Sequence, residues 1–94
     1  MAGRLVIGED SVPRLPRHCK MRFDKARDCW VILAPERVLM PDDIAVEVLQ
    51  RCKGDDVAAI IDDLAATFDA PRETIAKDVL AMLQDLADKG VVEA

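Results

Sequence analysis

Aromatic residues are scarce in this chain of 94 residues, which has no tyrosine and only Phe23, Trp30 and Phe68. The core must therefore be built from aliphatic side chains, and apolar residues make up 51% of the sequence. Charged residues add 33%, so a core and a solvated surface are both available, which excludes a wholly disordered chain. About a hundred residues suffice for one small domain and leave little room for a second.

Long apolar runs and paired cysteines are absent as well. No segment approaches the ~20 apolar residues that cross a bilayer, and charges interrupt the only apolar stretch near the start, Leu5-Val6-Ile7. Cys19, Cys29 and Cys52 are odd in number and show no CxxC spacing, which predicts free thiols in a reducing compartment. We therefore expect a cytoplasmic protein with no membrane partner. A Cys3His zinc set with His18 is the alternative, but it lacks short chelating loops, so no metal is predicted.

Positive charge is concentrated in one half of the chain. Residues 1–40 hold eight Lys or Arg against five Asp or Glu, a net of +3, whereas residues 41–94 hold five against thirteen, a net of −8. The acidic total of −5 argues against nucleic acid as a partner, because nucleic acid requires a concentrated basic face. The asymmetry indicates two structural parts with different roles.

Catalytic groups are equally few. The sole histidine, His18, adjoins a segment without periodicity, and the four glycines are isolated, so no phosphate-binding loop is present. Three acid pairs occur, of which Asp42-Asp43 and Asp55-Asp56 are explained by helix capping and Asp62-Asp63 by a solvated surface. No nucleophile, base and orienting group can be assembled, so we expect a protein that is not an enzyme and needs no cofactor.

The first half of the chain predicts a flexible arm and three strands. Residues 1–18 carry scattered Gly, Pro and charge, which predicts an arm that packs at most locally. The domain itself is then residues 19–94. Residues 19–25 alternate apolar and polar side chains, 29–33 are apolar throughout, and 37–40 form a short run stopped by Pro41. Short connections between them favour an antiparallel meander that must lean on helices.

Three helices are predicted in the second half. Asp42 or Asp43 begins the first, which carries Ile44, Ala45, Val48, Leu49 and Cys52 on one face and stops at Gly54. The second begins after Asp55 or Asp56 with the stripe Val57, Ile60, Ile61, Leu64 and Phe68. The third begins at Pro71 and carries Ile75, Val79, Met82, Leu83 and Leu86. Residues 91–92 are expected to fold back on the core. Strands followed by helices predict an α+β domain resembling a winged helix-turn-helix.

The third predicted strand, residues 37–40, is an edge in this order. Its unpaired N–H and C=O groups are open to another chain, and its sequence has no internal proline or inward charge to protect it. An edge beside an amphipathic helix is a receptor for an added peptide strand.

Several runs of residues resemble one family. Met21-Arg22-Phe23-Asp24, the segment from Trp30 to Leu39 (WVILAPERVL), Asp69-Ala70-Pro71-Arg72 and the segment from Leu83 to Gly90 (LQDLADKG) are similar to the PqqD family. The likeness covers residues 14–93 in order. The cysteines and Met40 do not look like fixed features of that family, which further weakens the zinc alternative.

The resemblance implies a peptide chaperone in pyrroloquinoline quinone biosynthesis. Members of this group bind the precursor peptide PqqA and present it to the radical-SAM enzyme PqqE, which cross-links a Glu and a Tyr of the peptide. The peptide is implied to add as a fourth antiparallel strand to the third strand, against the last helix. The chain is expected to be a monomer, although an exposed edge is also able to pair with a second copy.

This geometry predicts the peptide-binding residues. The main chain of residues 37–40 is expected to form the ladder, side chains of the last helix to line an apolar groove, and two cations to meet peptide carboxylates. The predicted set is Arg37, Val38, Leu39, Met40, Arg72, Ile75, Lys77, Val79 and Leu83.

Two other functions compete with this prediction. A winged-helix DNA-binding protein would share the fold class, but residues 72–89 hold three basic side chains against four acidic ones, a net of −1 where a recognition helix meets phosphates. A protein of the same pathway that binds the quinone directly is the second alternative, and no residue cluster argues for it.

Overall fold

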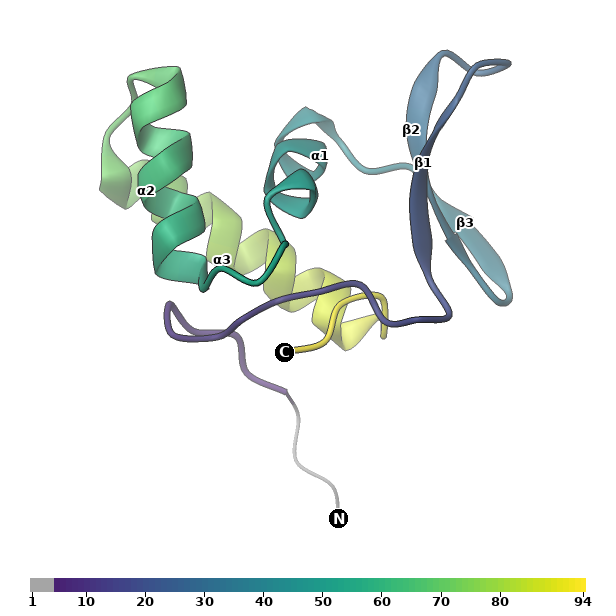
Figure 1. The fold of residues 1–94 in the computed structure, drawn as a ribbon, viewed down its shortest axis with the longest axis horizontal. Coiled ribbons are helices and arrows are strands. Elements are labelled where there is room, and N and C mark those ends of the chain that lie inside the picture. The colour runs from purple at the N-terminus through teal and green to yellow at the C-terminus, as the bar shows by residue number, and fades with distance from the viewer. Residues whose placement is uncertain (1–4) are drawn as a thin grey trace.

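A computed structural model describes residues 5–94 and shows three strands followed by three helices. The strands are β1 (Lys20–Asp24), β2 (Cys29–Ala34) and β3 (Arg37–Leu39), and they form one antiparallel sheet in the order β1-β2-β3. The helices α1 (Asp43–Gln50), α2 (Val57–Phe68) and α3 (Arg72–Asp88) all lie on one side of this sheet (Figure 1). The predicted α+β, winged helix-turn-helix-like class is confirmed.

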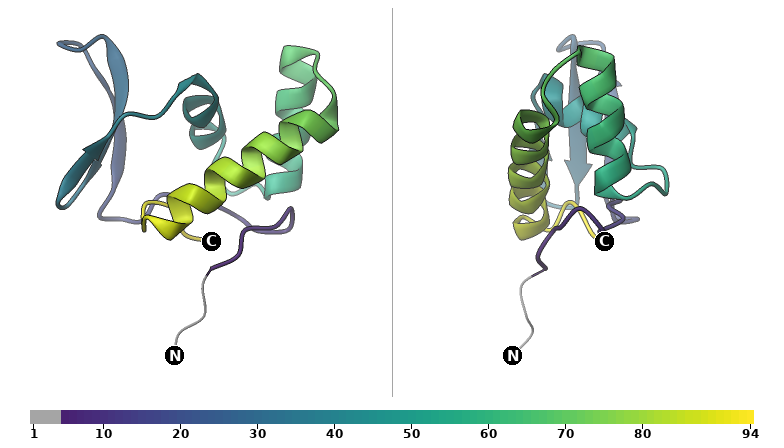
Figure 2. Two further views of the ribbon diagram at one scale, coloured as in Figure 1. Left: turned by 180° about the vertical axis from the view of Figure 1, so that it is seen from behind. Right: turned by 90° about the vertical axis from the view of Figure 1, so that its left-hand side faces the viewer.

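The register of the sheet decides which side chains face the helices. Met21 stands opposite Ile32, and Ile32 stands opposite Leu39, so all three share one face of the sheet. Ile32 is fully buried, while Met21 and Leu39 pack at the margin of the core. Figure 2 shows the same layering from two further sides, with the sheet at one end of the molecule and α2 at the other.

The helices begin and end close to the predicted residues, with two differences: α1 ends earlier than expected, and Pro71 precedes α3 as its N-cap instead of being its first residue. Asp42 caps α1 and Asp56 caps α2, each accepting a bond from the backbone N–H three residues on. α1 ends at Gln50, earlier than the expected stop at Gly54, because the N–H of Arg51 already bonds to carbonyls of the last turn. Cys52 therefore lies beyond the helix rather than on its face.

Gly90 reverses the chain after α3. Its φ of 77° is in the left-handed region, its N–H bonds to the carbonyl of Ala87, and the N–H of Val91 bonds to that of Leu86. This pattern is a Schellman motif, which only a residue tolerant of positive φ completes without strain. The chain then folds back as predicted, with Val91 and Val92 only 1% and 3% exposed.

The core is aliphatic, as the scarcity of aromatic residues predicted. Its fully buried members include Ile32, Val48, Val57, Ile60, Ile61, Val79 and Leu83. Two residues of the predicted stripes are exposed, Ile44 by 48% and Phe68 by 53%, whereas Val46, which the stripe omitted, is only 8% exposed. The buried face of α1 is thus turned toward Val46, which leaves Ile44 at the surface.

The segment before the sheet packs against residues that are distant in the sequence. Arg14 and Glu93 pair through both backbone N–H groups, at N···O distances of 2.8 and 2.9 Å, and Ile7 donates to the side chain of Gln84 at 2.9 Å. Ile7 is buried among the helices. These contacts differ from the local packing that we expected of residues 1–18, because backbone groups of this segment complete hydrogen bonds of α2 and the C-terminal residues. Residues 1–4 of the expected arm lie outside the described part, and its flexibility stays a prediction.

Candidate functional site

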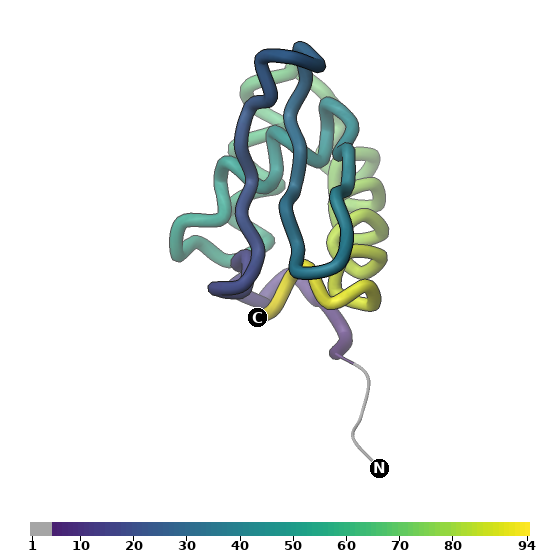
Figure 3. The backbone as a smooth tube through the Cα atoms, turned by 90° about the vertical axis from the view of Figure 1, so that its right-hand side faces the viewer, coloured from purple at the N-terminus to yellow at the C-terminus, as the bar shows by residue number. Residues whose placement is uncertain are grey.

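The free edge of β3 is the first part of the site. β3 is an outer strand of the sheet, and Figure 3 shows it on the same side of the molecule as α3. A two-residue turn at 35–36 joins it to β2, so Ala34 and Arg37 form the hydrogen-bonded pair next to the turn. Since hydrogen-bonded and non-hydrogen-bonded pairs alternate in an antiparallel ladder, Val38 directs its N–H and C=O away from β2. The main chain at Val38 is open to a further strand.

An apolar groove of about 580 Å³ is the second part of the site. Its wall is formed by α1, by the end of α2, by the first half of α3 and by one residue of β2. The apolar lining consists of Trp30, Ile44, Val46, Leu64, Phe68, Ile75 and Val79, and the polar lining of Asp43, Glu47, Gln50 and Asp78.

The groove begins where β3 ends. The last pair of the β2–β3 ladder is Ile32 with Leu39, so β2 extends beyond β3 and Trp30 has no partner on that side in the ladder. Trp30 instead packs edge-to-face against Phe23 of β1, with ring centroids 5.8 Å apart, and lines the groove. The first residues of α1, Asp43 and Ile44, face the same space. Edge and groove are therefore consecutive along the direction of β3.

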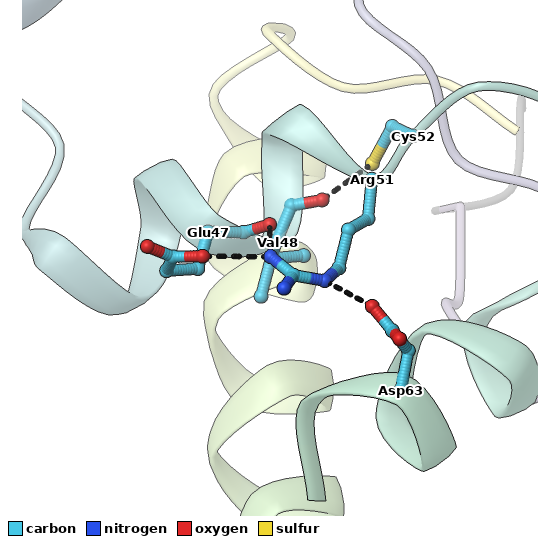
Figure 4. A network of polar contacts seen from close by, with 5 residues as sticks. All are labelled: Glu47, Val48, Arg51, Cys52 and Asp63. Atoms are coloured by element: carbon cyan, nitrogen blue, oxygen red, sulfur yellow. Dashed lines mark hydrogen bonds and ion pairs between the residues drawn. The ribbon is translucent and has the colours of Figure 1, made fainter. Parts of the chain in front are cut away.

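Arg51 fixes the helix that forms one wall. Figure 4 shows its guanidinium between α1 and α2, where Nη1 donates to the carboxylate of Glu47 at 2.7 Å and to its backbone carbonyl at 2.9 Å, while Nε donates to Asp63. The hydrogen bond with Glu47, followed by that with Asp63, raises the pKa of Arg51 above its ordinary value. The end of α1 is thereby tied to α2.

The rim of the groove is acidic. Asp43, Glu47 and Asp78 line it, and among the described lining residues there is no Lys, Arg or His. Glu47 shares its charge with Arg51, whereas Asp43 and Asp78 are exposed and form no ion pair with any residue from 5 to 94. The site therefore has an apolar floor and a net negative rim, which disfavours an anionic occupant.

The structure brings some of the predicted residues together. Arg37, Val38 and Leu39 form the edge strand and Met40 directly follows it, with Val38 51% and Met40 65% exposed. Ile75 and Val79 line the groove from α3, Ile75 half-buried and Val79 fully buried in its floor.

The other three predicted residues lie elsewhere. Leu83 is fully buried in the core, and Lys77 is exposed on α3 outside the groove lining. Arg72 is ion-paired with Glu9 at 2.6 Å and with Asp62 of α2, and its hydrogen bond with Glu9, then that with Asp62, raises its pKa. Its guanidinium is thus held by carboxylates of its own chain, and Asp62 is not the merely solvated surface that was expected.

Sequence reasoning missed the contribution of α1 and of the end of α2. Ile44 and Phe68 fitted the helical period and were assigned to the core, yet both are exposed and line the groove. The signal that a sequence offers is an excess of apolar positions over what the core of a small domain holds. Periodicity alone does not separate the two cases, since a groove and a core are lined by the same residue types.

The described residues offer neither a metal site nor a membrane-spanning helix. From residue 5 to 94, no group of three or more His, Cys, Asp or Glu is placed to hold a metal ion. Cys19 is buried, whereas Cys29 and Cys52 are half-buried, and all three are free thiols. Within the same range, no helix has both the length and the apolar character needed to cross a bilayer.

α3 has little that would suit nucleic acid. Two basic residues, Arg72 and Lys77, stand on it against four acidic ones, and Arg72 is already paired with carboxylates. A recognition helix needs exposed cations toward phosphates, so the charge of α3 argues against the DNA-binding alternative.

Fold and site together define a small recognition domain of the winged-helix type, with an open strand edge and an adjoining apolar groove. The family model of coenzyme PQQ synthesis protein D (PqqD) matches residues 29–92. The chain belongs to the PqqD family, as the sequence resemblance implied.

Relatives agree over almost the whole chain. A protein of Rhodopseudomonas palustris strain HaA2 named PqqA binding protein is 64% identical to this chain over 92 residues. The match covers 96% of this chain and 90% of the relative. The chain is also similar to the solution structure of the PqqD truncation of Methylobacterium extorquens PqqCD, with a TM-score of 0.82 and 44% identity over 94% of this chain and 95% of that one. That protein is described as a stand-alone recognition element for ribosomally synthesized and post-translationally modified peptides. The crystal structure of PqqD from Xanthomonas campestris gives 0.60 at 43% identity, over 94% and 99%.

Proposed function

We propose that this chain binds the precursor peptide PqqA by adding it as a fourth strand to β3 and presents it to the radical-SAM enzyme PqqE. Support comes from family membership and from relatives named PqqA binding protein. It also comes from the likeness to a stand-alone peptide recognition element. In this role the chain carries out no catalysis itself, and it acts as an adaptor in pyrroloquinoline quinone biosynthesis.

The open main chain at Val38 is the observation that carries the proposal. An added strand gains main-chain hydrogen bonds along the edge, while pockets for alternate side chains give the specificity. β3 supplies the edge, and the groove supplies a place for side chains through Ile75 and Val79. Both elements are required, because a three-residue edge alone offers few hydrogen bonds.

The same geometry supports the proposed presentation to the enzyme. A peptide bound as an edge strand stays extended and is accessible along its outer side, so a second protein is able to reach residues beyond the bound stretch. The adaptor raises the local concentration of the peptide at the enzyme rather than altering the peptide chemically. As a monomer, the chain keeps its edge free for the peptide.

A proline at position 38 tests strand addition directly. Val38→Pro removes the outward N–H and leaves the bonds of Arg37 and Leu39 to β2 in place, so we expect the sheet to remain and PqqA binding to fall at least tenfold. Isothermal titration with PqqA peptide measures the affinity, and chemical-shift mapping of labelled protein shows whether residues 37–40 respond.

Val38→Ala is the matched control. It shortens the same side chain but keeps the N–H, so its affinity is expected to stay within about threefold of the parent protein. Unchanged binding by the proline variant, with circular dichroism showing an intact fold, would exclude strand addition at β3. Absence of binding by the parent chain at near-millimolar peptide would reject the function itself.

A further inference from the structure

We propose that the groove beyond β3 binds the residues of the peptide that immediately precede the added strand, and that this stretch carries a Lys or Arg beside a large apolar side chain. The inference rests on the proposed function and extends it from the strand edge to the sequence that the site selects. Three observations carry it: the direction of β3, the size and lining of the groove, and the charge of its rim.

The direction of β3 determines which end of the peptide reaches the groove. β3 runs from Arg37 to Leu39, and the chain then enters α1, whose first residues Asp43 and Ile44 line the groove. A strand added antiparallel to β3 runs the opposite way. Its first residue therefore lies at the groove end, and the residues before it continue along Trp30 and α1.

The volume and the apolar lining of the groove suit peptide side chains rather than peptide main chain. Its volume of about 580 Å³ is within the range of pockets that bury small ligands, so it admits one or two large side chains. Trp30, Ile44 and Phe68 offer exposed apolar surface there, and Ile44 and Phe68 are 48% and 53% exposed without an occupant. An apolar side chain that covers them removes that surface from water.

The rim determines the charge of the occupant. Asp43 stands on α1 and Asp78 on α3, so the two carboxylates flank the groove from different helices, and neither pairs with a cation within residues 5–94. Glu47 lies beside Asp43 but is bound by Arg51. A Lys or Arg of the peptide would find carboxylates on either side of its apolar neighbour, whereas Asp or Glu would meet repulsion.

The test measures how strongly a variant with a neutralised rim binds intact and altered peptides. Asp43→Asn/Asp78→Asn is prepared with Asp55→Asn/Glu73→Gln as its control, since Asp55 and Glu73 are exposed carboxylates outside the groove lining. Dissociation constants are measured by isothermal titration at 50 mM and 500 mM NaCl with three peptides. These are intact PqqA, PqqA truncated just before the added strand, and PqqA with the Lys and Arg residues of that preceding stretch changed to Gln.

The neutralised rim is expected to weaken intact PqqA about threefold to tenfold at 50 mM NaCl, with the difference largely lost at 500 mM. The truncated and Gln-substituted peptides should bind both proteins equally, and the control variant should match the parent chain. Equal binding of intact PqqA by the parent and the rim variant overturns the inference. So does a preceding stretch without Lys or Arg. If Val38→Pro still abolishes binding in either case, the proposed function stands and only this extension fails.

Discussion

Ile75 and Leu83 lie eight residues apart on α3, about 12 Å along its axis, yet one lines the groove and the other is fully buried in the core. Both were expected to face the peptide. Their separation into two roles follows from the length of α3, whose first half lines the groove with Ile75 and whose second half contributes Leu83 to the core. The two positions therefore predict opposite phenotypes.

Leu83→Ala is expected to affect stability rather than recognition. Removing a fully buried leucine side chain leaves a cavity, so the free energy of unfolding should fall by about 2 to 5 kcal/mol. Urea unfolding followed by circular dichroism measures this loss. Titration of the folded fraction with PqqA should give an affinity within threefold of the parent chain, and a large loss of affinity at full folding would place Leu83 in the site after all.

Ile75→Ala should do the reverse. The side chain is half-buried in the groove wall, so its truncation costs the domain about 1 kcal/mol or less. The same truncation removes an apolar contact for the peptide, and we expect PqqA affinity to fall about tenfold, which corresponds to about 1.4 kcal/mol. A matched truncation outside the groove, Leu80→Ala, controls for the loss of a half-buried aliphatic side chain on α3.

The sequence was sufficient for the order of elements because their signals are local. Alternation in residues 20–24, the caps Asp42 and Asp56, and Gly90 each depend on neighbours within a few residues. The edge position of β3 followed from the same local reading. The open edge, which is the first half of the site, was therefore predictable.

The groove was not predictable, because it depends on how the helices are rotated against one another. α1 buries Val46 and exposes Ile44. The rotation of α1 about its own axis decides this, and the spacing of its apolar residues does not determine that rotation. The pairing of Arg72 with Glu9 joins residues 63 apart, and nothing in either neighbourhood indicates it. Long-range ion pairs and helix rotation are settled by tertiary packing, which a single sequence does not display.

Arg51 is expected to contribute more to stability than a typical surface cation. Its side chain is 22% exposed and joins Glu47 of α1 to Asp63 of α2, so Arg51→Met should lower the free energy of unfolding by about 1 kcal/mol. Lys89→Met is the control, because among residues 5–94 Lys89, the C-cap of α3, forms an ion pair only with Asp85 one turn earlier. That change should cost no more than about 0.5 kcal/mol. Equal effects in urea unfolding would contradict a specific role for the bridge between α1 and α2.

The thiol of Cys52 makes the free energy of unfolding depend on pH in the alkaline range. Burial raises the pKa of its thiol from an ordinary 9.0 to about 11, and the thiol also donates to the carbonyl of Val48. Because the folded state holds the proton more tightly, the contribution is complete below pH 9 and is lost as pH rises toward 11. We expect a loss on the order of 1 kcal/mol, since solvent still reaches part of the side chain.

Thermal unfolding between pH 8 and 11 measures this dependence against Cys52→Ala. The difference in melting temperature between the two proteins should shift in favour of the alanine variant as pH rises. A constant difference across the range would show that the folded state does not perturb the thiol.

The segment from residue 9 to 11 completes the N-terminus of α2. The N–H of Val57 donates to the carbonyl of Ser11 at 2.9 Å and that of Ala58 to the carbonyl of Glu9 at 2.8 Å, while Asp56 accepts from Ala59. Three donors that a helix start leaves unpaired are thus satisfied, two of them by main chain about 46 to 49 residues away. A substitution here cannot remove a main-chain carbonyl, so deletion is the appropriate test.

Removal of residues 1–11 is expected to lower the free energy of unfolding by more than 2 kcal/mol. It takes away both carbonyls and the buried Ile7, and it leaves Arg72 without Glu9. Asp56→Ala, which removes a single cap, should cost about 1 kcal/mol. Hydrogen exchange of the amides of residues 57–59 locates the effect, because all three should exchange faster in the deletion variant and mainly that of Ala59 in the point variant. A deletion variant as stable as the parent, with slow exchange at Val57 and Ala58, would mean that the segment is the mobile arm suggested by its composition.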